Sequence, residues 1–159
     1  MDNLKERNKT IFVIALAFLL YLPLTFLGYG LEVGYYDSQA VVHTVKTLIQ
    51  EHRYIPLRYP GDIVYELITT LLFMVGGHFF SNLGTLAISL AVIYSFIKIC
   101  GYRDIPHKHL LAIFMVLNPL YYVASTYTID YLWALAFLLI GYTLLIKKRY
   151  ILGGIFWAL

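Results

Sequence analysis

The sequence predicts an all-α membrane protein: a polytopic bundle of transmembrane helices with an outer-face loop that contains juxtamembrane helices. Of its 159 residues, 60% are hydrophobic and only 13% are charged, and the mean hydropathy is +0.73. Soluble domains carry roughly a quarter of charged residues. Five long apolar stretches follow one another, with basic residues clustered between them. Such clusters report membrane orientation and give little reason to expect a nucleic-acid partner.

The apolar stretches define the predicted elements. The first, residues 11–31, is about as long as the roughly 20 residues that span a bilayer, and no small-residue cleavage site follows it, so we expect an uncleaved transmembrane helix. The other elements are an outer loop with juxtamembrane helices over 32–80, transmembrane helices over 83–99, 110–123 and 131–146, and the start of a fifth over 151–159. Because this last stretch stops in mid-membrane, we interpret the chain as the N-terminal part of a longer protein.

Four groups of basic residues predict which stretches cross the membrane. They are Lys5, Arg7 and Lys9; Lys46, Arg53 and Arg58; Lys98, Arg103 and Lys108; and Lys147, Lys148 and Arg149. If residues 63–80 crossed as well, 3 of these 12 would be cytoplasmic and 9 external, against the positive-inside rule. If that segment stays on the outer side, 9 are cytoplasmic and 3 external. We therefore expect a multi-pass protein of the plasma (inner) membrane with a cytoplasmic N-terminus.

Apolar residues recur at helical spacing within the outer loop. They are Val41, Val42, Val45, Leu48 and Ile49, with polar residues between them. This pattern predicts an amphipathic helix of about three turns that lies in the membrane surface.

Three acids fall on the predicted outer face. Asp37 stands just before the surface helix and Asp130 just before the helix over 131–146. Either aspartate could cap its helix, because Asp is a favoured N-cap, or take part in catalysis. Glu66 lies on the non-crossing segment, where it avoids the roughly 2.5 kcal/mol or more that an acid costs at the bilayer centre. A polar residue at the level of the lipid headgroups is its alternative role. Glycosyl transfer needs such acids, one to accept a proton from a hydroxyl and another to orient substrate or bind a metal.

Arg58 is the candidate ligand for a donor phosphate, because its forked guanidinium matches phosphate oxygens. Contact with lipid headgroups is the alternative. Tyr36 and Tyr59 are candidate substrate-binding residues among ten outer-face tyrosines. The other eight are Tyr29, Tyr35, Tyr54, Tyr65, Tyr121, Tyr122, Tyr127 and Tyr131. Sugar stacking is one use for this set, and an interfacial aromatic belt is the commoner one.

No motif indicates a cofactor or a metal site. Cys100 is the only cysteine, and His107 and His109 lie in a predicted cytoplasmic loop with no carboxylate partner beyond Asp104. A divalent ion near the outer-face acids would suit the chemistry but is not indicated. The sequence also contains no nucleotide-binding, zinc-protease or nucleophile-elbow motif.

Taken together, these motifs and their order resemble the polytopic glycosyltransferases of the GT-C fold that use polyprenyl-phosphate sugars, including aminoarabinose transferases and protein O-mannosyltransferases. The matching features are Tyr35-Tyr36-Asp37-Ser38, Arg58-Tyr59-Pro60-Gly61 followed by Tyr65-Glu66-Leu67, the basic loop before His109-Leu-Leu-Ala, and Asn118-Pro119-Leu-Tyr-Tyr leading to Thr128-Ile-Asp130. The likeness covers nearly the whole chain.

The resemblance implies that Asp37 is the essential acid of the first loop, Asp130 the second outer-face acid and Arg58 a donor-phosphate ligand. The chain is then expected to act within a full-length hexosyl or pentosyl transferase. Its partners would be a polyprenyl-phosphate sugar, a lipid, glycan or protein acceptor, and membrane lipids. The alternative is a non-catalytic membrane protein, a transporter module or an assembly subunit, that binds lipid or a partner through the outer loop.

Overall fold

The computed structural model describes the backbone of residues 2–26, 36–56 and 63–158, and the side chains of these residues apart from 2, 3 and 36–42. Within these ranges the chain forms helices and no strand. The helices are α1 (Asp2–Phe26), α2 (Tyr36–Glu51), α3 (Ile63–Tyr102), α4 (Lys108–Val116), α5 (Pro119–Ala124), α6 (Tyr131–Ile146) and α7 (Tyr150–Ala158). The predicted all-α fold is confirmed for this part of the chain.

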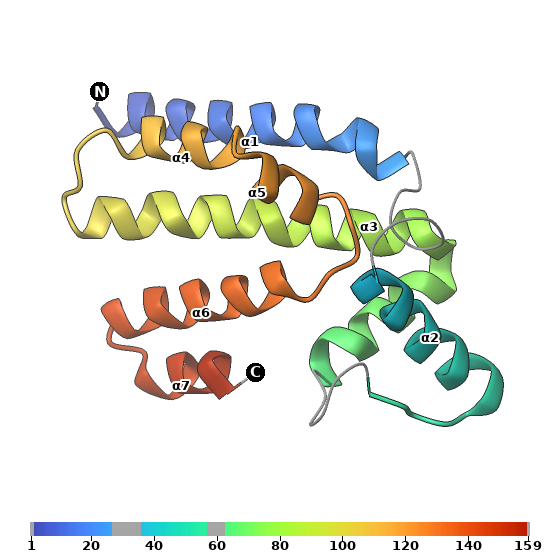
Figure 1. Cartoon of the computed structure of the whole chain (residues 1–159). Helices are drawn as coiled ribbons and strands as arrows, with labels where there is room; N and C mark the ends of the chain where they lie inside the picture. The colour runs from blue at the N-terminus through green and yellow to red at the C-terminus, as the bar shows by residue number, and fades with distance from the viewer. Residues whose placement is uncertain (1, 27–35, 57–62, 159) are drawn as a thin grey trace.

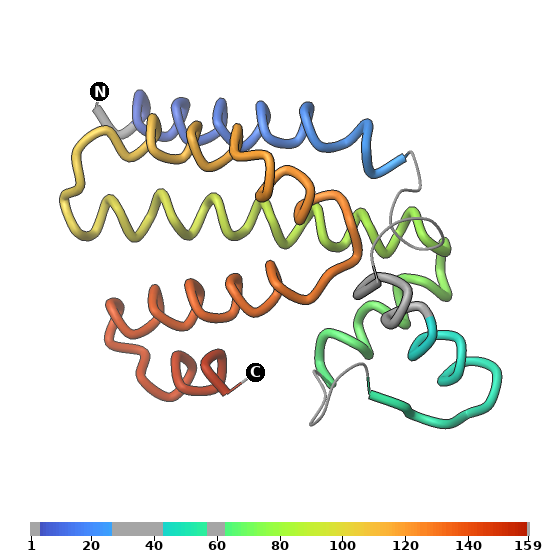
Figure 2. The backbone as a smooth tube through the Cα atoms, viewed as in Figure 1, coloured from blue at the N-terminus to red at the C-terminus, as the bar shows by residue number. Residues whose placement is uncertain are grey.

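The long helix α3 is the centre of the arrangement. In Figure 1, α1, α4 and α5 lie along one side of it, and α6 and α7 lie along the other. The tube in Figure 2 shows that α2 and the first part of α3 lie together at one end of this bundle. We call this the α2 end.

The core between α1, α3 and α4 follows helical spacing on each helix. Val13, Ala17 and Tyr21 of α1, four residues apart, are buried against Ile93 of α3 and Val116 of α4, among others. The Tyr21 hydroxyl donates a hydrogen bond to the carbonyl oxygen of Val116 at 2.8 Å. Its ring also meets Tyr122 edge to face, with centroids 5.3 Å apart. These contacts hold α1 against both neighbouring helices.

A bend at Gly76 and Gly77 divides α3 into two parts. Gly77 has φ 61° and ψ −147°, a backbone conformation that residues with a Cβ rarely adopt. At Gly76, an added Cβ would lie 2.1 Å from the Phe80 ring. The first part, residues 63–75, turns away from the bundle axis to pack beside α2 (Figure 1). The bundle therefore contains only the second part of α3.

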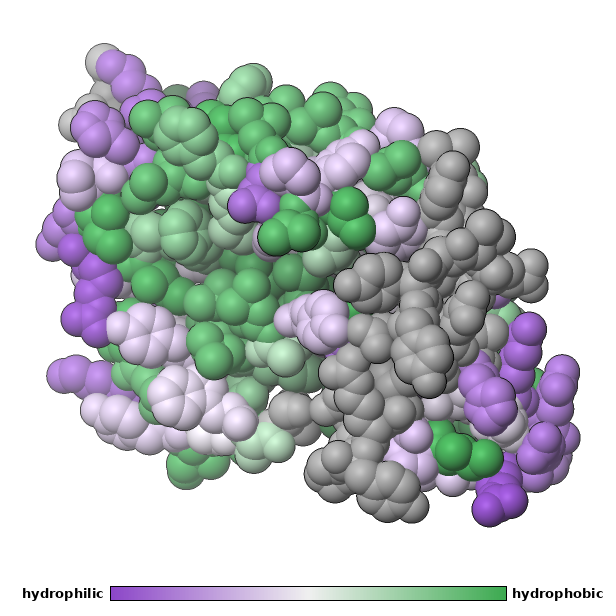
Figure 3. Space-filling model, in the orientation of Figure 1, coloured by the Kyte–Doolittle hydropathy of each residue, from purple (hydrophilic) through white to green (hydrophobic). Residues whose placement is uncertain are grey.

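In the part of the chain that the structure describes, two helices are long and apolar enough to cross a membrane by length and composition, Leu4–Phe26 and Ile63–Tyr102. The 40 residues of α3 would extend for about 60 Å if straight, twice the roughly 30 Å of a hydrocarbon core. The bend leaves residues 78–102 as a section of about 38 Å. In Figure 3, hydrophobic residues cover the side of the bundle, and hydrophilic residues gather toward its two ends.

The helix boundaries correct several predicted ones. The first helix begins at Asp2, well before the predicted residue 11, and residues 27–31 of that prediction lie outside the described part. The segment 63–80 and the predicted helix 83–99 belong to one helix bent at Gly76–Gly77. The predicted helix 110–123 is two helices, because the Asn118 side chain caps α5 and Pro119 occupies its first turn.

Other predicted elements agree with the structure. The helix over 131–146 coincides with α6, and the stretch predicted from 151 is α7, which begins at Tyr150. The amphipathic helix of the outer loop exists as α2, with Val45 buried and Lys46 exposed. Its position relative to a membrane surface stays a prediction.

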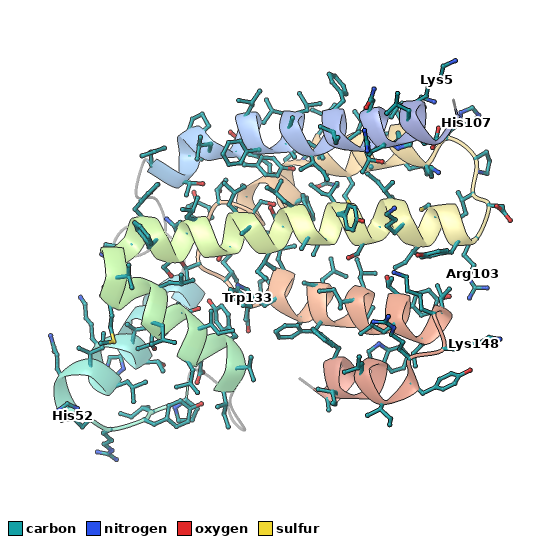
Figure 4. All side chains as sticks on the ribbon, turned by 180° about the vertical axis from the view of Figure 1, so that it is seen from behind. Lys5, His52, Arg103, His107, Trp133 and Lys148 are labelled. Carbon is teal, nitrogen blue, oxygen red and sulfur yellow. The ribbon has the colours of Figure 1, made fainter. Side chains whose placement is uncertain are left out.

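The first, third and fourth groups of basic residues lie at the same end of the bundle. Figure 4 shows Lys5, Arg103, His107 and Lys148 at this end, which we call the basic end. His52, which follows α2, lies at the opposite end in the same view. One set of helix ends thus carries most of the positive charge.

We expect Gly77→Ala to lower the stability of the protein by about 1–3 kcal/mol, because a Cβ is strained at this φ and ψ even though the space around it is open. Thermal unfolding in detergent measures the loss. Gly154→Ala is the matched control, since Gly154 lies inside α7 with equally open space and without a positive φ. Equal unfolding temperatures for both variants would contradict the role assigned to Gly77.

Candidate functional site

An aromatic cluster joins three elements at the α2 end. It consists of the buried residues Val45 of α2, Tyr65 of α3 and Trp133 of α6. The Tyr65 and Trp133 rings meet edge to face with centroids 5.5 Å apart, a favourable arrangement of aromatic quadrupoles. The cluster fixes the beginning of α3 against the beginning of α6, although 67 residues separate the two rings along the chain.

Glu66, the residue after Tyr65, lies in the interior. Its exposed fraction is 0%, and its carboxylate accepts a hydrogen bond from the Tyr54 hydroxyl. The interpretation of Glu66 as a residue on the protein surface is therefore wrong, and its depth relative to lipid headgroups stays a prediction. The bend in α3 explains the difference, because it brings this helical turn under the segment that follows α2. A buried carboxylate needs hydrogen-bond donors, and Tyr54 supplies one.

Asp130 precedes α6, as the sequence predicts, but its side chain makes no capping hydrogen bond. Its backbone carbonyl accepts bonds from the amides of Trp133 at 2.9 Å and Ala134 at 3.1 Å. The residue is 9% exposed. Of the two roles open to Asp130, side-chain capping of α6 is not the one observed.

A buried group of hydroxyl and amide side chains fixes the connection that carries Asp130. Thr128 Oγ1 lies 2.8 Å from both Ser81 Oγ and Asn82 Oδ1, which belong to α3. Ser125 and Thr126 of the same connection are also fully buried. Asp130 is thus placed two residues from a fixed point in the bundle. Hydrogen bonds between helices hold a structure firmly where the surroundings are apolar.

The amide nitrogen Nδ2 of Asn82 is buried and has no hydrogen-bond partner in the described part of the chain. Asn82 is not among the site residues predicted from the sequence. The signal was present in Ser81-Asn82, a polar pair between two apolar runs, and in the hydroxyl residues of Ser125-Thr-Tyr-Thr128. Thr128 bonds across to Ser81 and Asn82, whereas Ser125 and Thr126 donate to carbonyl oxygens of the preceding helix, α5.

The structure brings two of the six predicted site residues, Glu66 and Asp130, into elements that pack together. Asp37 is the second residue of α2 and Tyr36 the first, so Asp37 lies inside the helix and not before it. Their side chains, and all of Arg58 and Tyr59, lie outside the described residues. Figure 1 shows the starts of α2 and α6 at the same end of the bundle. The helix that carries Asp37 and the connection that carries Asp130 therefore share this end.

Some tyrosines serve neither of the two predicted roles, sugar stacking and an interfacial aromatic belt. The Tyr121 hydroxyl donates to the carbonyl oxygen of Ser89 at 2.7 Å and so joins α5 to α3. Tyr65 packs inside the aromatic cluster. Tyr131 stays 48% exposed beside Asp130. Tyr65 and Tyr121 thus stabilise contacts between helices, which neither an interfacial belt nor sugar stacking requires.

An apolar groove lies beside this site, between α2 and the first part of α3. It has a volume of about 380 Å³, and its lining includes Leu48, Ile49, Leu67, Leu71 and Met74. Such a lining suits a hydrocarbon chain. Among the residues that the structure describes, no group of three or more His, Cys, Asp or Glu side chains is placed to hold a metal ion.

We expect Tyr54→Phe to destabilise the protein by about 1–3 kcal/mol, because the buried Glu66 carboxylate loses a donor that water does not replace. Thermal unfolding in detergent checks this. Tyr150→Phe makes the same chemical change at a tyrosine that is 65% exposed, and should leave stability within about 0.5 kcal/mol of wild type. Equal effects would show that the bond to Glu66 contributes nothing.

No protein-family model, curated protein or solved structure matches this chain. The chemistry assigned to the α2 end therefore rests on the residues gathered there.

Proposed function

We propose that the chain acts in a multi-pass membrane glycosyltransferase that moves a sugar from a polyprenyl-phosphate donor to an acceptor on the outer face. One observation supports this most strongly. Asp130 is nearly buried, and it lies two residues after Thr128, whose hydroxyl bonds to α3 at the α2 end. An acid held at a fixed interior position, at the end where the helix of Asp37 also lies, fits a group that binds or positions a substrate.

In the proposed reaction, Asp37 accepts the proton of an acceptor hydroxyl. The hydroxyl oxygen attacks the anomeric carbon of the donor, and the bond from that carbon to the phosphate oxygen breaks, which inverts the anomeric configuration. The leaving polyprenyl phosphate keeps the electron pair, and Arg58 offsets its charge. Asp130 orients the acceptor and the donor, Glu66 supports the site from the interior through its bond to Tyr54, and Tyr36 and Tyr59 contact the sugar. A divalent ion is not needed to balance these steps.

The distribution of charge supports an outer-face site. The basic end carries nine of the twelve Lys and Arg residues and would lie in the cytoplasm. The α2 end would then lie on the other side, where lipid-linked sugars meet envelope acceptors. The apolar groove beside α2 offers a surface for the prenyl chain of the donor.

A second candidate is a non-catalytic membrane protein that binds lipid or a partner through the same end. The burial of Glu66 and its bond to Tyr54 favour it, because a fully enclosed carboxylate is also what a structural polar contact requires. The two candidate functions differ in whether sugar transfer requires the side chains of Asp37 and Asp130.

Cysteine labelling tests the sidedness. In a Cys100→Ala background, Arg53→Cys and Arg149→Cys place a thiol at exposed positions at the two ends, and each removes one arginine. A membrane-impermeant maleimide applied to intact cells should label residue 53 and not residue 149. Permeabilised cells should label both. Labelling of residue 149 in intact cells would reverse the orientation and exclude an outer-face site at the α2 end.

Asp37→Asn and Asp130→Asn in the full-length protein test the chemistry. Each should lower sugar transfer by roughly 100-fold or more, because a lost general base or substrate ligand costs that much, while the protein still accumulates in the membrane. Transfer is measured in membranes supplied with polyprenyl phosphates carrying radiolabelled mannose or aminoarabinose, each tested separately.

Asp104→Asn is the matched control. Asp104 is exposed near the basic end with φ 50°, a conformation that Asn also tolerates, so this variant should transfer sugar at the wild-type rate. Unchanged transfer in both site variants would refute the enzymatic proposal and favour the binding role.

A further inference from the structure

A second groove lies at the basic end, away from the α2 end, and both charged and apolar residues line it. It lies between α1 and α3, has a volume of about 630 Å³ and includes Arg7, Ile11 and Ile14 on α1. Tyr94 and Lys98 line it from α3, and Lys108 of α4 lies at its edge. None of these residues has a part in the proposed transfer.

The charges around the groove leave two cations without an acidic partner. Glu6 accepts a bond from Lys108 at 2.9 Å and another from Lys9 at 3.1 Å, so its charge is already offset. In the described part of the chain, no carboxylate lies within ion-pair distance of Arg7 or Lys98. The groove therefore has an excess of positive charge and favours an anionic ligand.

The charged residues lie toward the end of the bundle and the apolar ones toward its middle. Arg7, Ile11 and Ile14 follow one face of α1 at intervals of four and three residues, over about 10 Å of helix. Ile97 of α3, also at the groove, is 3% exposed, whereas Ile11 is 56% exposed. The groove therefore offers cations at one end and a partly uncovered aliphatic surface at the other. A ligand that fills it must be anionic at one end and apolar at the other.

Two further features adapt the groove to a headgroup. The Lys98 ammonium lies 5.4 Å from the centre of the Tyr94 ring, which holds its stem along the helix. At Gly101, a Cβ would lie 3.5 Å from Lys108 Nζ, so a larger residue would project into the space beside the cations. The small residue keeps this end of the groove open.

We propose that this groove binds one anionic phospholipid of the cytoplasmic leaflet. Its phosphate contacts Arg7 and Lys98, and one acyl chain lies over Ile11 and Ile14. Basic pockets between transmembrane helices suit such headgroups. This inference rests on the proposed membrane orientation but not on glycosyl transfer, so either can fail without the other.

Native mass spectrometry of the full-length protein in detergent tests the ligand class. Dioleoyl phosphatidylglycerol should remain bound, whereas dioleoyl phosphatidylcholine, which has no net charge, should dissociate at the same concentration. Glycerophosphoglycerol and inorganic phosphate should not displace the bound lipid at equal concentration, because they lack acyl chains. Equal retention of the two lipids, or displacement by either phosphate compound, would overturn the proposal.

Two variants test the location. Arg7→Gln together with Lys98→Gln should weaken phosphatidylglycerol binding by roughly tenfold or more. Lys148→Gln together with Arg149→Gln removes the same charge at the same end, from residues that do not line the groove, and should change binding by less than about twofold. Gly101→Leu fills the groove without removing a cation and should also weaken binding. Equal losses in the two double variants would indicate general charge attraction and exclude the groove.

Discussion

The positive φ at Gly77 allows the bend in α3, and this bend determines where the first part of α3, with Tyr65 and Glu66, lies. Because α3 turns there, its first part leaves the bundle and packs beside α2, which brings Tyr65 to Trp133 and encloses Glu66. A straight α3 of 40 residues would carry Glu66 far beyond the end of the bundle. The α2 end therefore depends on a conformation that glycine adopts at little cost and that other residues adopt only with strain.

Polar contacts between helices determine how the apolar helices fit together. The apolar core between α1, α3 and α4 supplies packing, and directional hydrogen bonds add specificity to the way the helices meet. The Tyr21 hydroxyl joins α1 to α4, Tyr121 joins α5 to α3, and Thr128 joins the connection before α6 to α3. The same contacts that fix the helices also place Asp130, so structural and candidate functional residues are continuous at the α2 end.

The two ends of the bundle differ in chemistry. One presents lysines and arginines around a groove that becomes apolar toward the middle of the bundle. The other gathers acids, tyrosines and hydroxyl residues around a short helix with its own apolar groove. Positive charge gathered at one end is the pattern that orients proteins in a membrane, and the two proposed binding sites are accordingly assigned to opposite ends.

The sequence by itself determined the local features. Apolar runs predicted the helices, the 131–146 boundaries matched α6, and periodic apolar residues predicted α2. These depend on neighbours within a few residues, whose preferences sequence patterns record. Only the tertiary structure decided that Glu66 is enclosed, that Asp130 does not cap its helix and that Ser81, Asn82 and Thr128 meet. Those outcomes depend on which surfaces face each other after α3 bends, and the periodicity of a single helix does not encode its partner.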